Sequence, residues 1–345
     1  MTVLRALGGA ATGLLAYKLL VPHADVRTRA VAPADERVLL LGASTGDGLG
    51  AGFLEQYLER GTKQLIIVGR RKEALEKVRE DVLARTASRR APDAQVSVFA
   101  ADCTRTADVV ALREFVLAQF GGIDTLHIIF GLTSILPLLG CADVDPLNVN
   151  ADGAPSASLY ATAEGLDNIA ATVQRSSDGN LKGSAIVLGA LIPALQTTSA
   201  YPVVVTTGSV AGLIPAPTRS VYCATKASQH YLVNSVALEC QSQAGTLVPG
   251  TDTRRALVRF LLLAPGPIKN SFVATHSVDA TTGPRDNRSN ALQVADIVRD
   301  TLRRVDKADF GMLVLPKYAF FAFLLTLFQA TRAVVANHAH KLYRY

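Results

Sequence analysis

The sequence predicts an α/β fold in which a doubly wound parallel sheet carries helices on both faces, with apolar segments at both ends of the chain. Three observations support this. The chain has 345 residues, enough for one large α/β domain. Short apolar runs typical of buried strands alternate with segments of helical periodicity. A glycine-rich turn joins the first run to the first helix.

The elements follow one another regularly. Each strand candidate is a run of apolar residues that ends in glycine or a polar residue, and each helix candidate has apolar residues at helical spacing. The predicted strands are 37–44, 64–69, 95–102, 124–131, 201–209, 257–266 and 311–316, and the first helices are 52–61, 72–85 and 108–121.

Two stretches interrupt the alternation and are predicted to be inserted loops. Residues 139–158 are rich in Asp, Pro, Gly and Ser, and residues 243–255 are similar. Neither stretch changes the predicted order of the sheet. The chain is therefore divided into an anchor and linker (1–36), a globular domain (37–316) and a C-terminal segment (317–345).

Composition restricts the class of protein. Hydrophobic residues make up 49% of the chain and charged residues 19%, with a net charge of +6. Because basic residues occur only in short pairs, without interleaved aromatic side chains, nucleic acid is not an expected partner. The cysteines show no metal-ligand spacing and are expected to be buried thiols in a reducing compartment, with no metal site. They are Cys103, Cys141, Cys223 and Cys240.

Both ends are expected to contact a membrane. The apolar run from Ala6 to Tyr17 is shorter than the roughly 20 residues that a bilayer span needs, and we interpret it as an uncleaved anchor with Lys18 at the headgroups. Residues 318–329 are dense in Phe and Leu and are followed by basic and aromatic residues, which favours an interfacial helix. Packing of this helix against the core, or against a second copy of the chain, is the alternative.

The turn after the first strand, "LGASTGDGLGAG", is a candidate phosphate site. Its glycines let a phosphate approach bare backbone at the N-terminus of the following helix. In a strand-turn-helix unit at the start of an alternating fold, this pattern indicates a dinucleotide. The glycines are Gly42, Gly46, Gly48, Gly50 and Gly52.

The end of the second strand predicts which dinucleotide binds. An acidic residue about 20 positions beyond the glycines holds a ribose 2′-hydroxyl, whereas arginine accommodates a 2′-phosphate. Here Arg70 and Arg71 occupy that place, which favours NADP(H) over NAD(H). At the end of the third strand, Asp102 is placed either to accept from the adenine amino group or to cap the next helix.

A tyrosine and a lysine lie four residues apart in "SVYCATKAS", so Tyr222 and Lys226 share one helix face. The pKa of a free tyrosine is ~10. For proton exchange near neutral pH it has to fall to about 7, which corresponds to about 4 kcal/mol. A cation about 4 Å away at a dielectric near 20 supplies about that much. Ser209, at the end of an apolar strand, can hold a carbonyl oxygen beside the phenol.

Together with the glycine turn and "APGPIKNSF", the Ser...Tyr-x-x-x-Lys pattern resembles the short-chain dehydrogenase/reductase family over about residues 37–316. The resemblance implies a seven-stranded Rossmann-type sheet and hydride transfer between nicotinamide and a carbonyl. It implies that Tyr222 is the acid/base, that Lys226 lowers the pKa of Tyr222 and binds the nicotinamide ribose, and that Ser209 orients the substrate. Asn180 resembles the family's helix asparagine, which holds a water for a proton relay.

The same resemblance supplies a set of cofactor-binding residues that surround the predicted NADP(H) site. They are Gly42, Ser44, Gly46, Gly48, Leu49, Gly50, Arg70, Arg71, Asp102, Gly131, Tyr222, Lys226, Pro265, Gly266 and Ile268.

The chain departs from the family pattern in three places. The glycine motif fits either as Gly42, Gly48 and Gly50, with two extra loop residues, or as Gly42, Gly46 and Gly48. The usual Asn-Asn-Ala-Gly after the fourth strand reads "IIFG" (128–131), so packing has to replace its polar contacts. Asn180 lies 29 residues before Ser209, a longer separation than usual.

The sequence therefore predicts a membrane-associated, NADPH-dependent reductase of an apolar carbonyl, such as a steroid, a lipid ketone or a retinoid, at the endoplasmic reticulum. The terminal segments resemble those of microsomal family members, including hydroxysteroid dehydrogenases. Membrane lipid is an expected partner and a homodimer is possible. One alternative is a non-catalytic NADP(H)-binding scaffold or redox sensor, and another is a soluble NAD(H) dehydrogenase.

Overall fold

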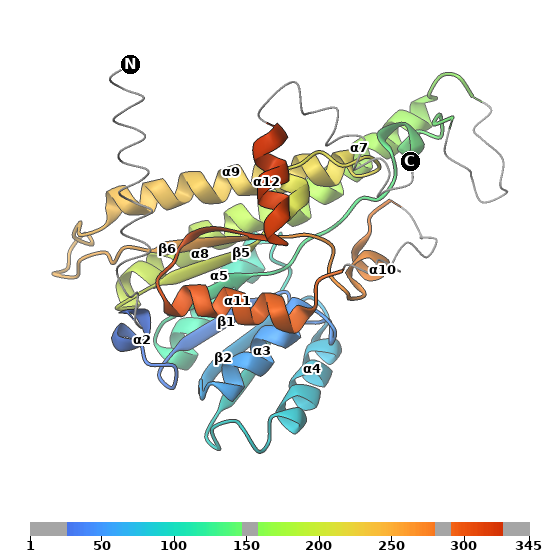
Figure 1. Cartoon of the computed structure of the whole chain (residues 1–345). Coiled ribbons are helices and arrows are strands. Elements are labelled where there is room, and N and C mark those ends of the chain that lie inside the picture. Colours follow the sequence, from blue (N-terminus) through green and yellow to red (C-terminus); the bar gives the residue numbers. More distant parts are fainter. Residues whose placement is uncertain (1–25, 147–157, 280–290, 327–345) are drawn as a thin grey trace.

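The computed structural model describes residues 26–146, 158–279 and 291–326 (Figure 1). Seven parallel strands form one sheet in the order β3-β2-β1-β4-β5-β6-β7. The predicted doubly wound sheet is confirmed, and every strand lies within its predicted range. The strands are β1 (Arg37–Leu41), β2 (Gln64–Gly69), β3 (Gln95–Ala100), β4 (Thr125–Ile128), β5 (Val203–Thr207), β6 (Arg259–Pro265) and β7 (Gly311–Leu315).

The described helices agree with the sequence analysis where it assigned them. α4 matches its predicted range, while α5 begins two residues earlier than predicted and ends at Phe120, one residue earlier, with Gly121 as a left-handed C-cap at a φ of +67°. The helices are α2 (Val26–Ala30), α3 (Leu49–Glu59), α4 (Lys72–Arg85), α5 (Thr106–Phe120), α6 (Leu138–Cys141), α7 (Ala163–Ser177), α8 (Gly183–Thr198), α9 (Ser220–Gln243), α10 (Phe272–His276), α11 (Val294–Asp306) and α12 (Lys317–Thr326).

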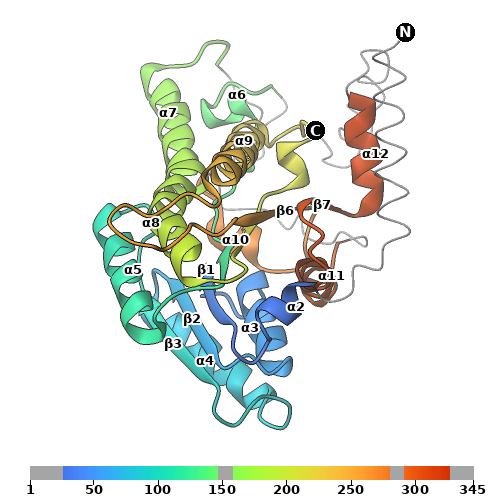
Figure 2. The same cartoon turned by 90° about the vertical axis from the view of Figure 1, so that its left-hand side faces the viewer.

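Alternate residues of the strands pack on opposite faces of the sheet, as the pleat requires. On β1, Leu39 and Leu41 join a core with α5, α8 and α9. Val38 and Leu40 join a second core with α3, α4 and α11. Figure 2 shows these two helical layers on either side of the strands. Since both faces are covered, the central strands are mostly apolar, which is why the sequence reveals them so clearly.

The structure adds a long helical stretch that the sequence analysis did not assign. Residues 163–198 form α7, a π-helical turn (Asp178–Lys182) and α8, and the stretch contains Pro193. Glycines and an internal proline weaken the helical pattern in the sequence, whereas packing against α5 and α9 stabilises the helix in the fold. The predicted loop 139–158 is also partly wrong, because α6 covers its beginning.

The stretch Ala163–Thr198 is the one helix among the described residues that is long and apolar enough to cross a membrane. Half of its most apolar window is buried inside the protein, as expected of a core helix. The predicted N-terminal anchor lies outside the described residues. Of the C-terminal segment, the structure describes α12, which rises from the end of β7 (Figure 2). Its Ala319 is buried against Ala264 of β6 and Val314 of β7.

The cysteines are free thiols, as predicted: Cys103, Cys141 and Cys240 are buried and Cys223 is half-buried. Burial raises the pKa of Cys103 to about 12 and the pKa values of Cys141 and Cys240 to about 11. These thiols are therefore protonated and unreactive at neutral pH.

A buried polar cluster lies at the amino end of the central strands. The Arg27 guanidinium on α2 is 2.7 Å from the Glu36 carboxylate, and both side chains are fully buried. Thr125 at the start of β4 donates to the same carboxylate oxygen at 2.6 Å. Tyr57 and His127 lie beside this pair, with the phenol oxygen 2.8 Å from His127 Nε2. The cluster ties α2 to the sheet.

The stability of the fold is expected to fall with acid because of His127. Burial, together with Arg27 and Arg60, lowers the pKa of His127 from 6.5 to about 3. As the pH falls below 6.5, His127 becomes protonated in the unfolded chain but stays neutral in the folded chain. The free energy of unfolding should therefore drop between pH 6.5 and about 3, by at most about 1.4 kcal/mol per pH unit from this residue.

Urea unfolding of the wild type and of His127→Gln at pH 7, 6, 5 and 4.5 tests this. The glutamine variant should be less stable at pH 7 and should lose less stability on acidification, so that the two curves converge. Parallel curves would show that His127 does not cause the acid sensitivity.

Candidate active site

The residues predicted to form the site meet at the carboxyl edge of the sheet, where they line one cavity of ≈ 1030 Å³. In a parallel sheet the ends of all strands share this edge, so residues far apart in sequence converge there. The glycine turn follows β1, Arg70 follows β2, Gly131 follows β4 and Ser209 follows β5. Of the predicted site residues, Gly46, Gly50 and Asn180 are the ones that do not line the cavity.

The structure decides between the two alignments of the glycine turn. Gly48 is the N-cap of α3, and Gly50 lies in the first helical turn. A Cβ on Gly50 would be 2.5 Å from Ala43 Cα, whereas a Cβ on Gly46 would have no neighbour within 4 Å. The helix start at Gly48 and the tight packing at Gly50 therefore match the alignment through Gly42, Gly48 and Gly50, in which the turn contains two extra residues.

Gly42 lets the first strand approach the fourth. Its φ is +104°, and a Cβ there would be 2.5 Å from the backbone nitrogen of Phe130. In "IIFG", the backbone N–H groups of Ile129 and Phe130 both donate to Leu41 O, at 2.8 and 3.0 Å. Ile129 packs on one core and Phe130 on the other. Apolar packing therefore holds this segment in place, as the sequence analysis expected.

Two arginines stand over the glycine turn at the end of β2. Arg70 and Arg71 are exposed and line the cavity. The Arg71 guanidinium donates to the carbonyl and hydroxyl oxygens of Ser44, both at 3.3 Å. A ligand phosphate near Ser44 would meet two positive charges and no carboxylate from this strand end.

Asp102 also lines the cavity, and one of its oxygens caps a local turn. Oδ1 accepts from the Thr104 backbone N–H at 2.9 Å and from its hydroxyl at 2.8 Å. Burial opposes the shift, but these hydrogen bonds and nearby Arg70 hold the pKa of Asp102 below its usual value. The alternative prediction, that Asp102 caps the next helix, is wrong, because the N-cap of α5 is Arg105 and no side chain caps it. The adenine contact stays a prediction.

Lys226 is buried one helical turn after Tyr222, on α9. Its Nζ donates to Thr207 O at 3.0 Å and to Gln229 Oε1 at 2.9 Å. Burial lowers the pKa of Lys226 to about 7. The lysine is therefore divided between its charged and neutral forms near neutral pH, and a hydrogen-bonding or anionic partner would favour the charged form.

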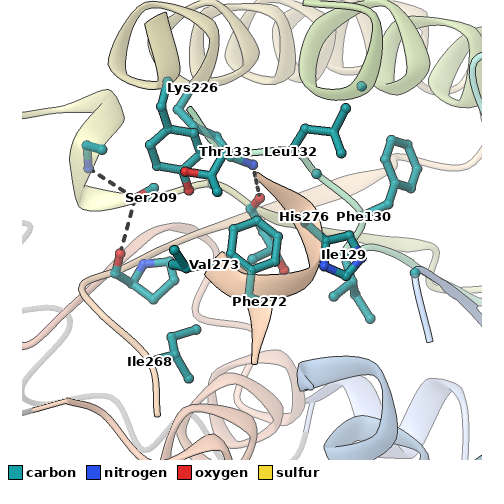
Figure 3. Close-up of a pocket in the computed structure, with 18 of the residues that line it drawn as sticks. Ile129, Phe130, Leu132, Thr133, Ser209, Lys226, Ile268, Phe272, Val273 and His276 are labelled. Atoms are coloured by element: carbon teal, nitrogen blue, oxygen red, sulfur yellow. Dashed lines mark hydrogen bonds between the residues drawn. The ribbon is translucent and has the colours of Figure 1, made fainter. Parts of the chain in front are cut away.

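Ser209 faces the same cavity from the end of β5 (Figure 3). Its hydroxyl accepts from the Ala211 N–H at 3.1 Å and reaches Pro265 O at 3.5 Å. Its backbone N–H donates to His230 Nε2 at 3.2 Å. Burial lowers the pKa of His230 to about 4, so the ring is neutral and its Nε2 accepts. The sequence analysis did not identify His230 as a support for the Ser209 loop.

Asn180 lies under the cavity, in the π-helical turn between α7 and α8. Its amide accepts from Leu132 N–H at 2.8 Å and donates to Leu132 O and Thr225 Oγ1, both at 2.9 Å. A Cβ on Gly131 would be 2.9 Å from Asn180 Oδ1 and 3.2 Å from Lys226 Nζ. The asparagine therefore joins the segment after β4 to α9, next to the lysine.

The segment 269–279, here called the lid segment, covers the cavity from the β6 side. Thr133 N–H donates to His276 O at 3.0 Å, and Val278 N–H donates to Thr133 O at 2.9 Å. At its beginning, the Asp47 carboxylate accepts from the backbone N–H and hydroxyl of Ser271, both at 2.8 Å. Asp47 belongs to the lengthened glycine turn. The extra residues of that turn thus include one that binds the lid segment.

Apolar side chains that the sequence analysis did not identify form much of the remaining lining. Figure 3 shows Phe272 and Val273 of the lid segment together with Ile129, Phe130 and Leu132. Tyr318, Ala319 and Ala322 of α12 line the cavity as well. No local sequence pattern marks these residues, because they meet only through the topology of the sheet.

The chain matches a family model and several solved structures. The family model, described as short chain dehydrogenase, matches residues 36–276. An alcohol dehydrogenase from the archaeon Thermococcus sibiricus, complexed with 5-hydroxy-NADP, is 17% identical with a TM-score of 0.58, over 81% of this chain and 95% of its own. No curated protein matches the chain in sequence.

Two bacterial structures are similar to the chain in the same way. A short-chain dehydrogenase from Streptomyces avermitilis is 19% identical with a TM-score of 0.60, over 90% of this chain and 98% of its own. A short-chain dehydrogenase/reductase from Burkholderia phymatum, in complex with NAD, is 17% identical with a TM-score of 0.62, over 88% and 96%. At these identities the structural similarity establishes the fold.

A matched pair of substitutions tests the geometry of the glycine turn. Gly50→Ala should destabilise the ligand-free protein by about 1–3 kcal/mol, because the new methyl group collides with the backbone of Ala43. Gly46→Ala should change stability by less than about 0.5 kcal/mol, since that position has open space. Thermal unfolding without ligand is the measurement. Equal destabilisation by both substitutions would support the other alignment.

Proposed function

Because the chain belongs to the short-chain dehydrogenase family, we propose that it is an NADP(H)-dependent oxidoreductase that reduces a carbonyl group of an apolar substrate. One observation carries the proposal: Ser209, Tyr222 and Lys226 line the same cavity as the glycine turn and the two arginines. A single extended ligand could therefore contact the catalytic residues with one end and the arginines with the other.

The residues of the cavity fit a dinucleotide. Gly42 and Gly48 leave the N-terminus of α3 open to a pyrophosphate, as helix N-termini allow. Gly131 has no side chain to block the approach to Lys226, and Pro265, Gly266 and Ile268 line the cavity on the β6 side. The nicotinamide would supply the hydride, and this chain would supply the binding site and the proton.

In the proposed reaction, Tyr222 donates its phenolic proton to the carbonyl oxygen of the substrate as that oxygen gains negative charge. The Ser209 hydroxyl donates a hydrogen bond to the same oxygen and holds it beside the phenol. Lys226, in its charged form, stabilises the phenolate that Tyr222 leaves behind. The phenolate then regains a proton through Lys226 and the polar groups around it.

The preference for NADP(H) rests on charge at the end of β2. Arg70 and Arg71 can bind a 2′-phosphate by charge-assisted hydrogen bonds. Arg71 is already oriented over the glycine turn by its contacts with Ser44. No carboxylate stands beside them on β2 to take a ribose 2′-hydroxyl instead.

An apolar substrate is supported by the lining of the cavity and by α12. One side of α12 lines the cavity, while Phe320, Phe321 and Leu324 are exposed. A helix with aromatic side chains toward solvent is typical of a membrane-surface contact. We therefore keep the membrane association, with the endoplasmic reticulum as location, as part of the proposal. A steroid, a lipid ketone or a retinoid would reach the cavity from the lipid phase.

Cofactor selectivity tests the proposal. The detergent-solubilised protein, which contains no tryptophan, should bind NADPH more tightly than NADH in a nicotinamide fluorescence titration. Arg70→Asp should weaken NADPH binding by about 10- to 100-fold, the value of a hydrogen bond to a charged group, and should improve NADH relative to NADPH.

Arg254→Asp, on the exposed loop before β6, is the charge-matched control and should leave the ratio unchanged. Unchanged selectivity in Arg70→Asp would disprove the 2′-phosphate site. Absence of binding to both cofactors would favour the scaffold alternative.

The role of Tyr222 is tested by removing its hydroxyl group. Tyr222→Phe should lower kcat by at least about 100-fold, because general acid catalysis contributes about that much or more, and should leave NADPH binding intact. Tyr231→Phe, at an exposed position of the same helix, is the control and should keep full activity. If the Tyr222→Phe variant kept about 5% or more of the wild-type turnover, Tyr222 would be excluded as the main proton donor.

A further inference from the structure

Lys226 contacts a buried glutamine that the proposed mechanism does not use. Gln229 lies on α9, three residues after Lys226, and its side chain is fully buried. Its Oε1 accepts from Lys226 Nζ at 2.9 Å, and its Nε2 donates to Ser184 Oγ at 2.9 Å. The Ser184 hydroxyl donates to the backbone carbonyl of Asn180 at 2.8 Å. These bonds form a buried chain from Lys226 to the π-helical turn.

The direction of this chain is determined at its far end. The Asn180 carbonyl can only accept, so Ser184 has to donate its hydroxyl proton there. The Ser184 oxygen is then free to accept from the glutamine amide NH₂ group. Gln229 must consequently present its carbonyl oxygen to Lys226. The amide orientation follows from the network and not from the shape of the side chain.

The contact with Gln229 uses one of the three hydrogen-bond donors of the Lys226 ammonium group. An ammonium group has three N–H donors, of which Thr207 O and Gln229 Oε1 accept two. One donor remains for a group that enters the cavity. Both acceptors are neutral, and they stabilise the charged form of a lysine that has been removed from water.

Other titratable groups near Lys226 do not replace this contact. On α9 they are Tyr222 and His230, and burial keeps His230 neutral with a pKa of about 4. In the π-helical turn, Asp178 is 3.3 Å from Lys182. On the lid segment, burial and the arginines after β2 lower the pKa of His276, which favours its neutral form. The contacts from β5 and from the segment after β4 come from uncharged groups.

We propose that Gln229 is a positioning residue, which holds the Lys226 amine at the floor of the cavity through the Ser184–Asn180 chain and favours its charged form. The positioning role is inferred from the hydrogen bonds that join Lys226, Gln229, Ser184 and Asn180. Its catalytic consequence rests on the proposed function, because only then does Lys226 support proton transfer by Tyr222.

The test is a titration of the lysine Nζ group by ¹⁵N NMR in the full chain without cofactor, with the Lys226 signal assigned by Lys226→Met. Gln229→Leu keeps the volume and removes the acceptor, so the pKa of Lys226 should fall by about one unit. Gln229→Glu adds a negative charge, so the pKa should rise by one unit or more. Ser184→Ala, which frees the glutamine, should produce a smaller fall.

Gln196→Leu is the matched control, because Gln196 is a buried glutamine at the far end of α8 that bonds Gln243. It should change stability without changing the titration of Lys226. Opposite shifts in Gln229→Leu and Gln229→Glu support the proposal, since a general loss of packing would move both in one direction. If one of the two Gln229 variants fails to fold, the pKa of Lys226 in the other variant and in Ser184→Ala still tests the positioning role of Gln229.

The same pKa of Lys226 in all variants, or shifts of one sign in both glutamine variants, would overturn the proposal. In the activity assay, the basic limb of the pH profile of kcat/KM should move in parallel with the NMR values. If the wild type shows no NADPH-dependent turnover while the NMR shifts have opposite signs, the proposed function fails and the positioning role of Gln229 stands.

Discussion

The close approach of β1 to β4 at their carboxyl ends is the constraint on which the rest of the site depends. The chain leaves β1 toward one face of the sheet and leaves β4 toward the other, so a crevice opens between them. The crevice forms only if Gly42 carries no side chain and Leu41 O receives two backbone donors from "IIFG". The glycine turn, Gly131 and the floor beneath them take their positions from this contact.

The fold was predictable because its strands are buried on both faces. A strand such as β5, whose five residues are all buried, has an unbroken run of apolar and β-branched residues. α4 was equally clear, since its apolar side alternates with charged residues. The helical stretch 163–198 was not, because its stability comes from packing on both sides and its glycines and proline obscure the pattern.

The candidate site was predictable where a spacing expresses the geometry directly. Tyr222 and Lys226 are one turn apart on a helix, and the glycine turn sits between a strand and a helix. The contacts that support these residues come from elsewhere in the chain. Ser184 reaches Gln229 across 45 residues, and Asp47 reaches Ser271 across 224 residues. No local pattern encodes such pairs, so they become visible only in the folded chain.

The buried pair of Arg27 and Glu36 restricts how the chain can be shortened. Glu36 stands just before β1, and the closer of its two counter-ions, Arg27 at 2.7 Å, comes from α2, outside the strand-helix units of the sheet, while Arg60 is 3.8 Å away. A truncation that removes the apolar beginning of the chain together with α2 would take away the closer of the two cations, leave the buried carboxylate with Arg60 at 3.8 Å and Thr125, and destabilise the fold. A shortened chain for crystallisation therefore has to begin before Val26, so that α2 and its arginine are retained.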